Sequence, residues 1–497
     1  MRKIISFLLV FTMIICLSSL PVYAEDDIVK IELNNENTLV NGDTITTDTE
    51  AAVYLAYDII YYPEGKGETF GNARDEDDVH SQEEADKNAV IHITKAGTYK
   101  LSGELFGQIA VDLGEDSKRD ENAIVTLILN NVSLECSVAS AICVYNVYEC
   151  GSYDSHTPDV STEKAGINIV LADNSINNIK GSYVTGIFKP GSIEFFEDGR
   201  VASATLMHRY TGAIHAQMSM NITSSIENPG TLNITGMEDG ISSRNHLTIN
   251  GGVYNINTKD YGIFAYGHSV SVLSLNNANI VSTSTSQKQY DVAYGIRSEG
   301  WTVVNDCHII SIGNTNNGDA GLFVQKELIV NSGVVISSGS LPKNIKTEMN
   351  SVSFNFKEIV QPNTLIRLSK NNNDIFNIKI LGPINTLSYI GSNLTKGEYQ
   401  LSINDVLFSD SKHADVSIND GHTEVDNIDK YIPPDYTTAI LITVIVIGSI
   451  LIAIGGFVLI KHFITKLKMN YERIEAAKKA EQKKKRKNKK KHKKKKR

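Results

Sequence analysis

One short motif recurs four times between residues 239 and 340, and it constrains the fold more than any other feature of the chain. Each copy starts at a glycine, continues with an aliphatic residue, and has a small or apolar residue two places further on. The positions between are mostly polar or aromatic, so the motif alternates as a strand with one buried face does. The copies start at Gly240, Gly262, Gly295 and Gly321.

An asparagine gives each copy a second fixed point. Asn250, Asn305 and Asn331 each lie ten residues after their glycine, whereas Asn276 comes four residues late in the copy that starts at Gly262. A β-type run follows each asparagine, so one unit has three short strands in about 22 residues. Such a unit cannot bury its own apolar side and must stack on its neighbours, which would align the aliphatic residues in a column and the asparagines in a hydrogen-bonded ladder. The pattern predicts an all-β chain folded as a parallel β-helix.

Two apolar segments lie near the ends of the chain. Residues 1–24 have two basic residues, an apolar run and a final Val-Tyr-Ala, which is typical of a secretory signal peptide. Residues 437–460 carry no charge and are long enough to span a bilayer as one transmembrane helix. The following tail, residues 461–497, holds 19 Lys and Arg against 3 Glu, and positive charge marks the cytoplasmic side. The sequence predicts a single-pass protein of the cell membrane with an extracellular ectodomain and a cytoplasmic tail.

The net charge of −9 conceals two oppositely charged parts. With the tail and the two N-terminal basic residues set aside, residues 25–460 carry −27. A surface this acidic excludes nucleic acid as a partner of the exported part. The basic tail is expected to contact anionic lipids, with a ribosome or nucleic-acid contact as the alternative.

The exported part is expected to contain three regions. Residues 25–88 form a lead-in with an acidic loop, residues 89–340 the β-helix, and residues 341–430 a small β domain that caps the helix and acts as a stalk. Residues 145–160 and 184–209 interrupt the rhythm and are expected to protrude as loops. Five cysteines occur, one of them in the predicted signal peptide, and the remaining four are too few for a disulfide scaffold, although the sequence leaves open a disulfide among Cys136, Cys143 and Cys150.

Three stretches resemble a known bacterial family. Residues 97–112 read GTYKLSGELFGQIAVD, residues 125–131 read VTLILNN, and residues 239–256 read DGISSRNHLTINGGVYNI. These runs are similar to the opening and the coils of carbohydrate-binding domain-containing proteins, and the resemblance extends in pieces from residue 28 to residue 340. It implies a right-handed parallel β-helix similar to pectate lyases, on an exported surface protein. It also implies binding of cellulose or pectic acid, with calcium.

Acidic residues stand just before the repeated glycines, namely Glu238, Asp239, Asp260 and Asp319. Stacked units are about 4.8 Å apart, and carboxylates at that spacing repel one another unless a cation lies between them. Calcium accepts several oxygen ligands in loose geometry. The column therefore predicts a calcium site, with a solvent-exposed row of turn residues as the alternative.

Outward side chains of the glycine strand predict a glycan-binding strip. Aromatic faces stack on sugar rings, and arginine forks pair with uronate carboxylates. The alternative is ordinary solvent-facing decoration of the strand. The predicted ligand-binding residues are Arg244, Phe264, Tyr266, Arg297 and Phe323.

The leading hypothesis is a cell-surface protein that binds a polysaccharide such as cellulose or a uronic-acid polymer without turnover. A calcium-dependent polysaccharide lyase on the same fold is the first alternative, with Arg297 and then Arg244 as candidate bases. A structural stalk or adhesin is the second. The scattered acids do not favour a hydrolase, and His215, His246 and His268 are interpreted as turn residues rather than metal ligands.

Overall fold

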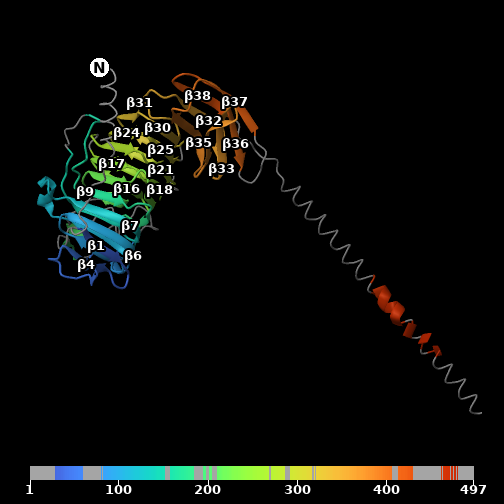
Figure 1. Ribbon diagram of the computed structural model, residues 1–497, viewed down its shortest axis with the longest axis horizontal. Helices are drawn as coiled ribbons and strands as arrows, with labels where there is room; N and C mark the ends of the chain where they lie inside the picture. The colour runs from blue at the N-terminus through green and yellow to red at the C-terminus, as the bar shows by residue number, and fades with distance from the viewer. Residues whose placement is uncertain are drawn as a thin grey trace, which may run out of the picture. The chain divides into compact units, whose positions relative to one another are not determined.

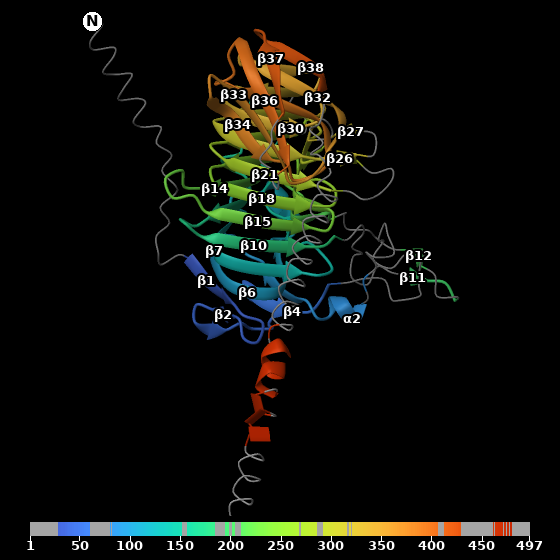
Figure 2. The same cartoon turned by 90° about the vertical axis from the view of Figure 1, so that its right-hand side faces the viewer.

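The computed structural model describes residues 28–428 and parts of the tail. The gaps are residues 60–79, 81, 152–156, 184–193, 198–200, 204–209, 268–269, 286–291, 316–317, 320 and 406–411, and the described parts of the tail are residues 461, 463–470, 472–473, 475–476 and 478–479. The described residues are mostly β, and most strands join one large mixed sheet without a closed barrel. Successive strands lie as layers along the molecule (Figures 1 and 2).

The repeat forms three ladders of parallel strands, in which each strand pairs with its counterpart in the next unit. The first ladder contains β13 (Gly212–Ala216), β16 (Asp239–Arg244), β19 (Ile263–Tyr266), β23 (Ile296–Ser298) and β28 (Leu322–Val324). The second contains β14 (Met220–Ser224), β17 (His246–Asn250), β20 (Val272–Asn276), β24 (Trp301–Asn305) and β29 (Glu327–Val330). The third contains β15 (Thr231–Gly236), β18 (Val253–Thr258), β21 (Asn279–Ser284), β25 (Cys307–Ile312) and β30 (Gly333–Ser338).

The aliphatic column predicted from the repeat is confirmed. Ile241, Ile263, Ile296 and Leu322 are register partners along the first ladder. The three isoleucines are fully buried and the leucine is nearly so. Burial of these stacked side chains between the ladders supplies the main stabilisation of each unit, because no unit has an apolar core of its own.

The predicted asparagine ladder is also confirmed. Asn276 Nδ2 donates to Asn250 Oδ1 at 2.7 Å, Asn305 Nδ2 to Asn276 Oδ1 at 2.7 Å, and Asn331 Nδ2 to Asn305 Oδ1 at 2.8 Å. The residue after each of the first three rungs has a left-handed backbone, with φ of 73° at Gly251, 51° at Asn277 and 51° at Asp306. Glycine, asparagine and aspartate tolerate this conformation best, which explains the sequence around each rung.

The N-terminal strands join the same stack. β1 (Ile28–Leu33) runs parallel to the long β6 (Gly97–Asp112), and β4 (Val53–Ala56) runs antiparallel to β5 (Ala89–Ile93). The remaining strands of this region are β2 (Leu39–Val40), β3 (Asp43–Thr44), β7 (Val125–Cys136), β8 (Ile142–Asn146), β9 (Ile167–Leu171) and β10 (Ile176–Gly181), with a 3-10 turn at Glu115–Arg119.

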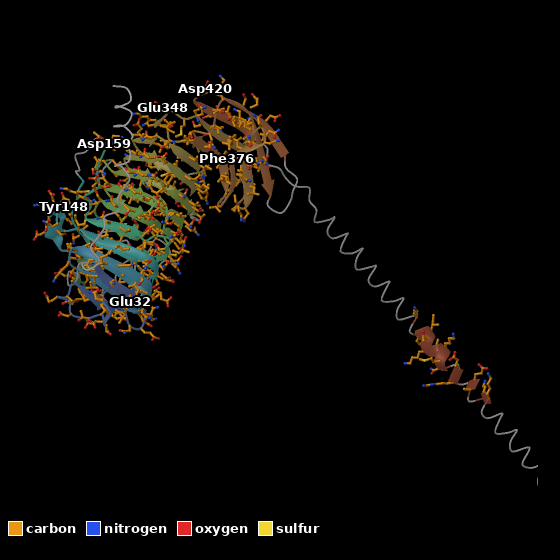
Figure 3. All side chains as sticks on the ribbon, viewed as in Figure 1. Glu32, Tyr148, Asp159, Glu348, Phe376 and Asp420 are labelled. Carbon is orange, nitrogen blue, oxygen red and sulfur yellow. The ribbon has the colours of Figure 1, made fainter. Side chains whose placement is uncertain are left out.

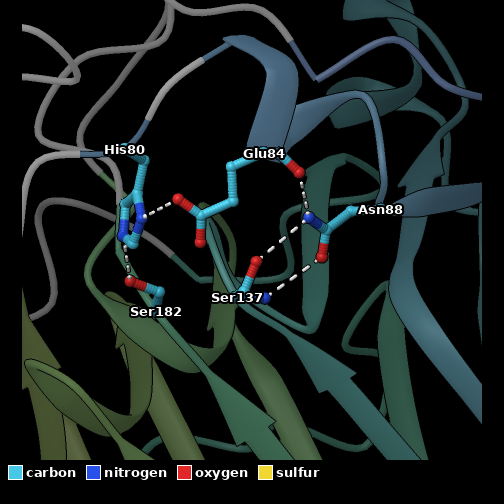
Figure 4. A network of polar contacts seen from close by, with 5 residues as sticks. All are labelled: His80, Glu84, Asn88, Ser137 and Ser182. Carbon is cyan, nitrogen blue, oxygen red and sulfur yellow. Dashed lines mark hydrogen bonds and ion pairs between the residues drawn. The ribbon is translucent and has the colours of Figure 1, made fainter.

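A short helix, α2 (Gln82–Ala85), is pinned to these strands by side-chain hydrogen bonds (Figure 4). His80 bonds Glu84 Oε2 through Nδ1 at 3.0 Å and Ser182 Oγ through Nε2 at 3.1 Å. Asn88 donates to Ser137 Oγ at 3.1 Å and accepts from the Ser137 backbone N–H at 3.1 Å. These bonds hold the helix over the side of the stack.

A second β region follows the last unit and shares its core. β35 (Ile384–Gly391) pairs antiparallel with β30 and with β32 (Ser351–Val360), which also pairs with β38 (His422–Ile428). Ile312 and Ile336 of the third ladder pack in one cluster with Phe354 and Tyr389. A separate antiparallel sheet contains β34 (Asn373–Lys379), β33 (Thr364–Lys370), β36 (Gly397–Asp405) and β37 (Lys412–Ile418), while β31 (Ile345–Thr347) extends the second ladder.

Several predicted segments lie wholly or largely outside the described residues. These are the signal peptide, the membrane span at 437–460, the basic run that ends the tail, and most of the loop at 184–209, of which the hairpin β11 (Glu194–Phe195) and β12 (Val201–Ser203) is described. Within the described part of the chain, no helix is long and apolar enough to cross a membrane. Residues 432–497 form a unit of their own, in which Lys479 pairs with Glu475 at 2.8 Å.

The four cysteines in the described part of the chain are free, and Cys136, Cys143 and Cys307 are buried whereas Cys150 is half-buried. No disulfide joins the first three, although the sequence left one open. His215 and His246 lie in β13 and β17, so their interpretation as turn residues is wrong. The turn before β17 is at Asn245, whose φ is 70°, one residue earlier than expected. His268 lies outside the described residues.

Candidate functional site

The first ladder brings four of the five predicted ligand-binding residues together, since the ring centroids of Phe264 and Tyr266 are 5.2 Å apart and three of the four are register partners. Phe264, Arg297 and Phe323 are register partners on consecutive strands, and all three side chains are half-buried on its outward face. The guanidinium carbon of Arg297 lies 4.9 Å from the ring centroid of Phe264 and 5.5 Å from that of Phe323. Arginine at this distance from a ring face is attracted by the ring quadrupole.

Two tyrosines that the sequence analysis did not single out complete this surface. The Arg297 guanidinium lies 4.6 Å from the Tyr261 ring centroid, and the Tyr261 and Phe264 centroids are 4.9 Å apart. Tyr294 lies 5.1 Å from Phe323, centroid to centroid. Both tyrosines directly precede a repeated glycine, so their shared position was a signal in the sequence. We refer to the set as the aromatic–arginine strip: Tyr261, Phe264, Tyr266, Tyr294, Arg297 and Phe323.

The positive charge at the centre of the strip is partly offset by one acid. Arg297 Nη2 lies 3.5 Å from Glu299 Oε1, and the two side chains are 25% and 29% exposed. Glu299 Oε2 also accepts a hydrogen bond from the Gly267 backbone N–H at 3.2 Å. Because the ion pair is long and partly screened by water, it contributes little to stability. The Nε of Arg297 is buried, so the Nη atoms of this quarter-exposed side chain are the donors left for an incoming acceptor.

Tyr266 marks one end of the strip, and its hydroxyl belongs to an internal network. His215 Nε2 lies 3.0 Å from the hydroxyl, and Gln217 Nε2 donates to it at 3.2 Å. Burial raises the pKa of Tyr266, and the charge of Arg244 opposes that shift. Arg244 is the register neighbour of Tyr266 on β16, so the structure places it beside this end of the strip.

The predicted acidic column is partly assembled, and its described members are buried. Glu238, Asp239 and Asp260 are 5%, 2% and 7% exposed, so the alternative of a solvent-exposed row does not describe them. The backbone N–H of Asp260 donates to the carbonyl of Glu238 at 2.8 Å, which stacks these two turns. Among the described residues, no group of three or more His, Cys, Asp or Glu side chains is placed to hold a metal ion.

Asp239 and Asp319 of the predicted acidic column lie on different strands, β16 and β27 (Gly318–Asp319). The carboxylate of Asp239 accepts hydrogen bonds from the Thr211 hydroxyl and from the Tyr261 backbone N–H, so it holds the turn beneath the strip. Asp319 lies in β27 (Gly318–Asp319), which pairs with β26 (Asn314–Thr315) and through it with β22 (Val292–Ala293). The side chain of Asp319 is outside the described ones.

Comparison with known proteins agrees with the resemblance found in the sequence. Residues 87–151 match a family model described as carbohydrate-binding domain-containing protein. The match covers β5 to β8, and over this stretch the expected resemblance is confirmed. None of the curated proteins compared with the chain matches it. The family match supports polysaccharide binding as the function.

Proposed function

We propose that the protein binds an acidic polysaccharide, without turnover, along the aromatic–arginine strip. The observation that carries the proposal is the position of Arg297 between the rings of Phe264 and Phe323, on an outward, half-buried face. The rings fix the guanidinium in one place, so little side-chain entropy remains to be lost when a ligand binds. A fixed guanidinium recognises a carboxylate through paired N–H donors.

The chemistry of the strip favours uronic-acid polymers over neutral ones. A uronate carboxylate would compete with Glu299 for the Nη atoms of Arg297, while a neighbouring aromatic face stacks on the C–H face of the sugar. Stacked strands about 4.8 Å apart offer such contacts at regular intervals, which suits a polymer more than a single sugar.

We further propose that the three ladders constitute a right-handed parallel β-helix. The parallel register of equivalent strands over successive units supports this architecture, as does the family match. We also propose a single-pass membrane anchor at 437–460 with an extracellular ectodomain, supported by the uncharged span and the basic tail after it. Calcium dependence remains part of the proposal, since the stacked turns at Glu238 and Asp260 bring two carboxyl groups to adjacent units.

The test compares Arg297→Lys with Arg297→Ala in the full-length chain, purified in a detergent that lacks a sugar headgroup. Binding to polygalacturonate and to cellulose is measured by co-sedimentation with and without calcium. Lysine keeps the charge but loses the planar fork, so both variants should bind polygalacturonate at least about tenfold more weakly. Arg367→Ala, an exposed arginine on β33, is the matched control and should bind normally.

Two results would contradict the proposal. Unchanged polygalacturonate binding by both Arg297 variants would show that the aromatic–arginine strip is not the binding surface. Appearance of unsaturated uronate absorbance during the incubation would show a lyase, since β-elimination leaves a double bond in the product.

A further inference from the structure

A short amphipathic helix follows the uncharged run 437–460 in the tail of the chain. The described residues between 461 and 479 are all α-helical, and residues 463–470 form a continuous stretch. The side chains of this helix project to both sides of the ribbon (Figure 3). Phe463 comes three residues after Ile460, the last residue of the uncharged run, so an inference about this helix rests on the proposed membrane anchor.

Three large apolar side chains lie on one side of this helix and are open to solvent. Phe463, Ile464 and Leu467 are each more than half exposed. An α-helix turns about 100° per residue, so these three positions fall within a sector of about 100°, which is the width of the apolar stripe on a helix that buries one face. Adjacent apolar side chains of this size are unfavourable in water. We therefore expect this face to be covered when the tail is in place.

Lysines border the apolar face on both sides. Lys466 lies about 60° beyond Phe463 round the helix, and Lys468 lies about 40° beyond Ile464. Among the described residues of the tail, the ion pair is that of Lys479 with Glu475, so neither bordering lysine is neutralised by a carboxylate. A lysine beside an apolar face keeps its methylene stem on that face and extends its ammonium group toward water or phosphate.

The charges decide between two kinds of partner for this face. A second copy of the helix packed in parallel would bring Lys466 and Lys468 beside the same lysines, and like charges repel. The surface of an anionic bilayer attracts both lysines instead. A helix of this composition lies in the plane of the interface and buries its apolar face at the boundary of headgroups and acyl chains.

We propose that residues 463–470 lie in the headgroup region of an anionic membrane, with Phe463, Ile464 and Leu467 turned toward the acyl chains. This contact is apolar as well as electrostatic, whereas the basic run that ends the tail carries charge alone. The helix would thereby hold the start of the tail flat against the bilayer.

Two labels in the same stretch of helix test its orientation. Leu467→Cys and Thr465→Cys place a thiol at positions about 160° apart round the helix. Each is labelled with the environment-sensitive NBD group in a chain that also carries Cys16→Ser and Cys150→Ser, and the other native thiols are buried. The labelled full-length chain is reconstituted in nanodiscs of phosphatidylcholine, with and without phosphatidylglycerol.

In anionic nanodiscs the label at position 467 should emit at shorter wavelength and be quenched by lipid that is spin-labelled near the headgroup. The label at position 465 should keep its emission in water. In neutral nanodiscs the shift at position 467 should be smaller, because the bordering lysines lose their anionic partner.

A double substitution tests the apolar contribution. Phe463→Glu with Ile464→Glu should abolish the shift at position 467, because carboxylates do not enter the acyl region. Glu472→Gln with Arg473→Gln is the matched control, since it changes two residues away from the apolar face and leaves the net charge unchanged. The control should keep the shift.

Two results would overturn the inference. One is equal, water-like emission from both labels in anionic nanodiscs. The other is a shift at position 467 that appears only in nanodiscs holding two chains, which would show a helix pair. Failure of the membrane anchor is distinguishable, because the chain would then not copurify with nanodiscs whichever residue carried the label. The same labelled chain mixed with anionic vesicles would still test the helix, and no shift at position 467 there would also overturn the inference.

Discussion

Replacing one interior rung of the asparagine ladder should destabilise the protein about twice as much as replacing its last rung. Asn276 makes two ladder bonds of 2.7 Å, to Asn250 and from Asn305, whereas Asn331 makes one of 2.8 Å. A net contribution of about 0.5–1.5 kcal/mol per hydrogen bond gives roughly 1–3 kcal/mol for Asn276→Ala and half of that for Asn331→Ala. The backbone pairing of the strands is unchanged by either substitution.

Urea unfolding followed by Trp301 fluorescence measures the difference, since this ring lies on the strand that carries Asn305. Asn233→Ala is a matched control, because Asn233 also makes two amide bonds of 2.9 Å, to Asn178 and from Asn255, but on an exposed face. Its cost should be smaller than that of Asn276→Ala. Equal costs for Asn276→Ala and Asn331→Ala, at equal m-values, would refute the view that the side-chain ladder stabilises the stack.

Three further predictions concern single side chains. Glu299→Gln should strengthen polygalacturonate binding several-fold in co-sedimentation, because the competing carboxylate is removed from Arg297; weaker binding would contradict this view of the strip. Burial lowers the pKa of His246 to about 4, whereas the pKa in the unfolded chain is about 6.5. Between these two pH values the unfolded state binds one proton more than the folded state. The free energy of unfolding should therefore fall as the pH drops from 6.5 toward 4. The expected loss of unfolding free energy is roughly 3 kcal/mol. The urea midpoint of His246→Asn should depend less on pH over this range than that of the unchanged protein, and an equal dependence would rule His246 out as the cause. Alkylation of the native chain with iodoacetamide at pH 8, read by peptide mass spectrometry, should label the half-buried Cys150 before the three fully buried thiols, and faster labelling of Cys136 would show that the stack opens there.

Much of the fold could be predicted because the repeat encodes it locally. The offset from Gly262 to Ile263 and on to Asn276 fixes which side chains point inward and where each turn falls, whatever the rest of the chain does. The same locality explains why the outward position of Phe264 and Arg297 was foreseen. The repeat also predicts that these two side chains are neighbours, because equivalent residues of adjacent units stack on one another.

Other features depend on contacts between residues far apart in sequence and could not be predicted. The hydroxyl of Thr211, 28 residues earlier in the chain, donates a hydrogen bond that offsets the cost of burying Asp239. The sequence of the turn gives no sign of that bond. A pocket lined by Asn221 exists because residues 158–163 cross the second ladder. Thr162 of this segment accepts a hydrogen bond from Asn221, although the two residues are 59 positions apart in the sequence. The interior position of the Tyr266 hydroxyl likewise depends on His215, 51 residues away.

The antiparallel strands at the two ends of the stack have a consequence for self-association. A parallel ladder that simply stopped would present a free edge on which the same strand of a second molecule could add, and repetition of that step would build a fibre. β4 lies antiparallel against β5 at one end, and β35 lies antiparallel against β30 at the other. A strand of reversed direction cannot template the next parallel unit in register. These two strands therefore cover one edge of the first ladder and one edge of the third, and a chain cut after Gly339 would leave the edge of β30 uncovered.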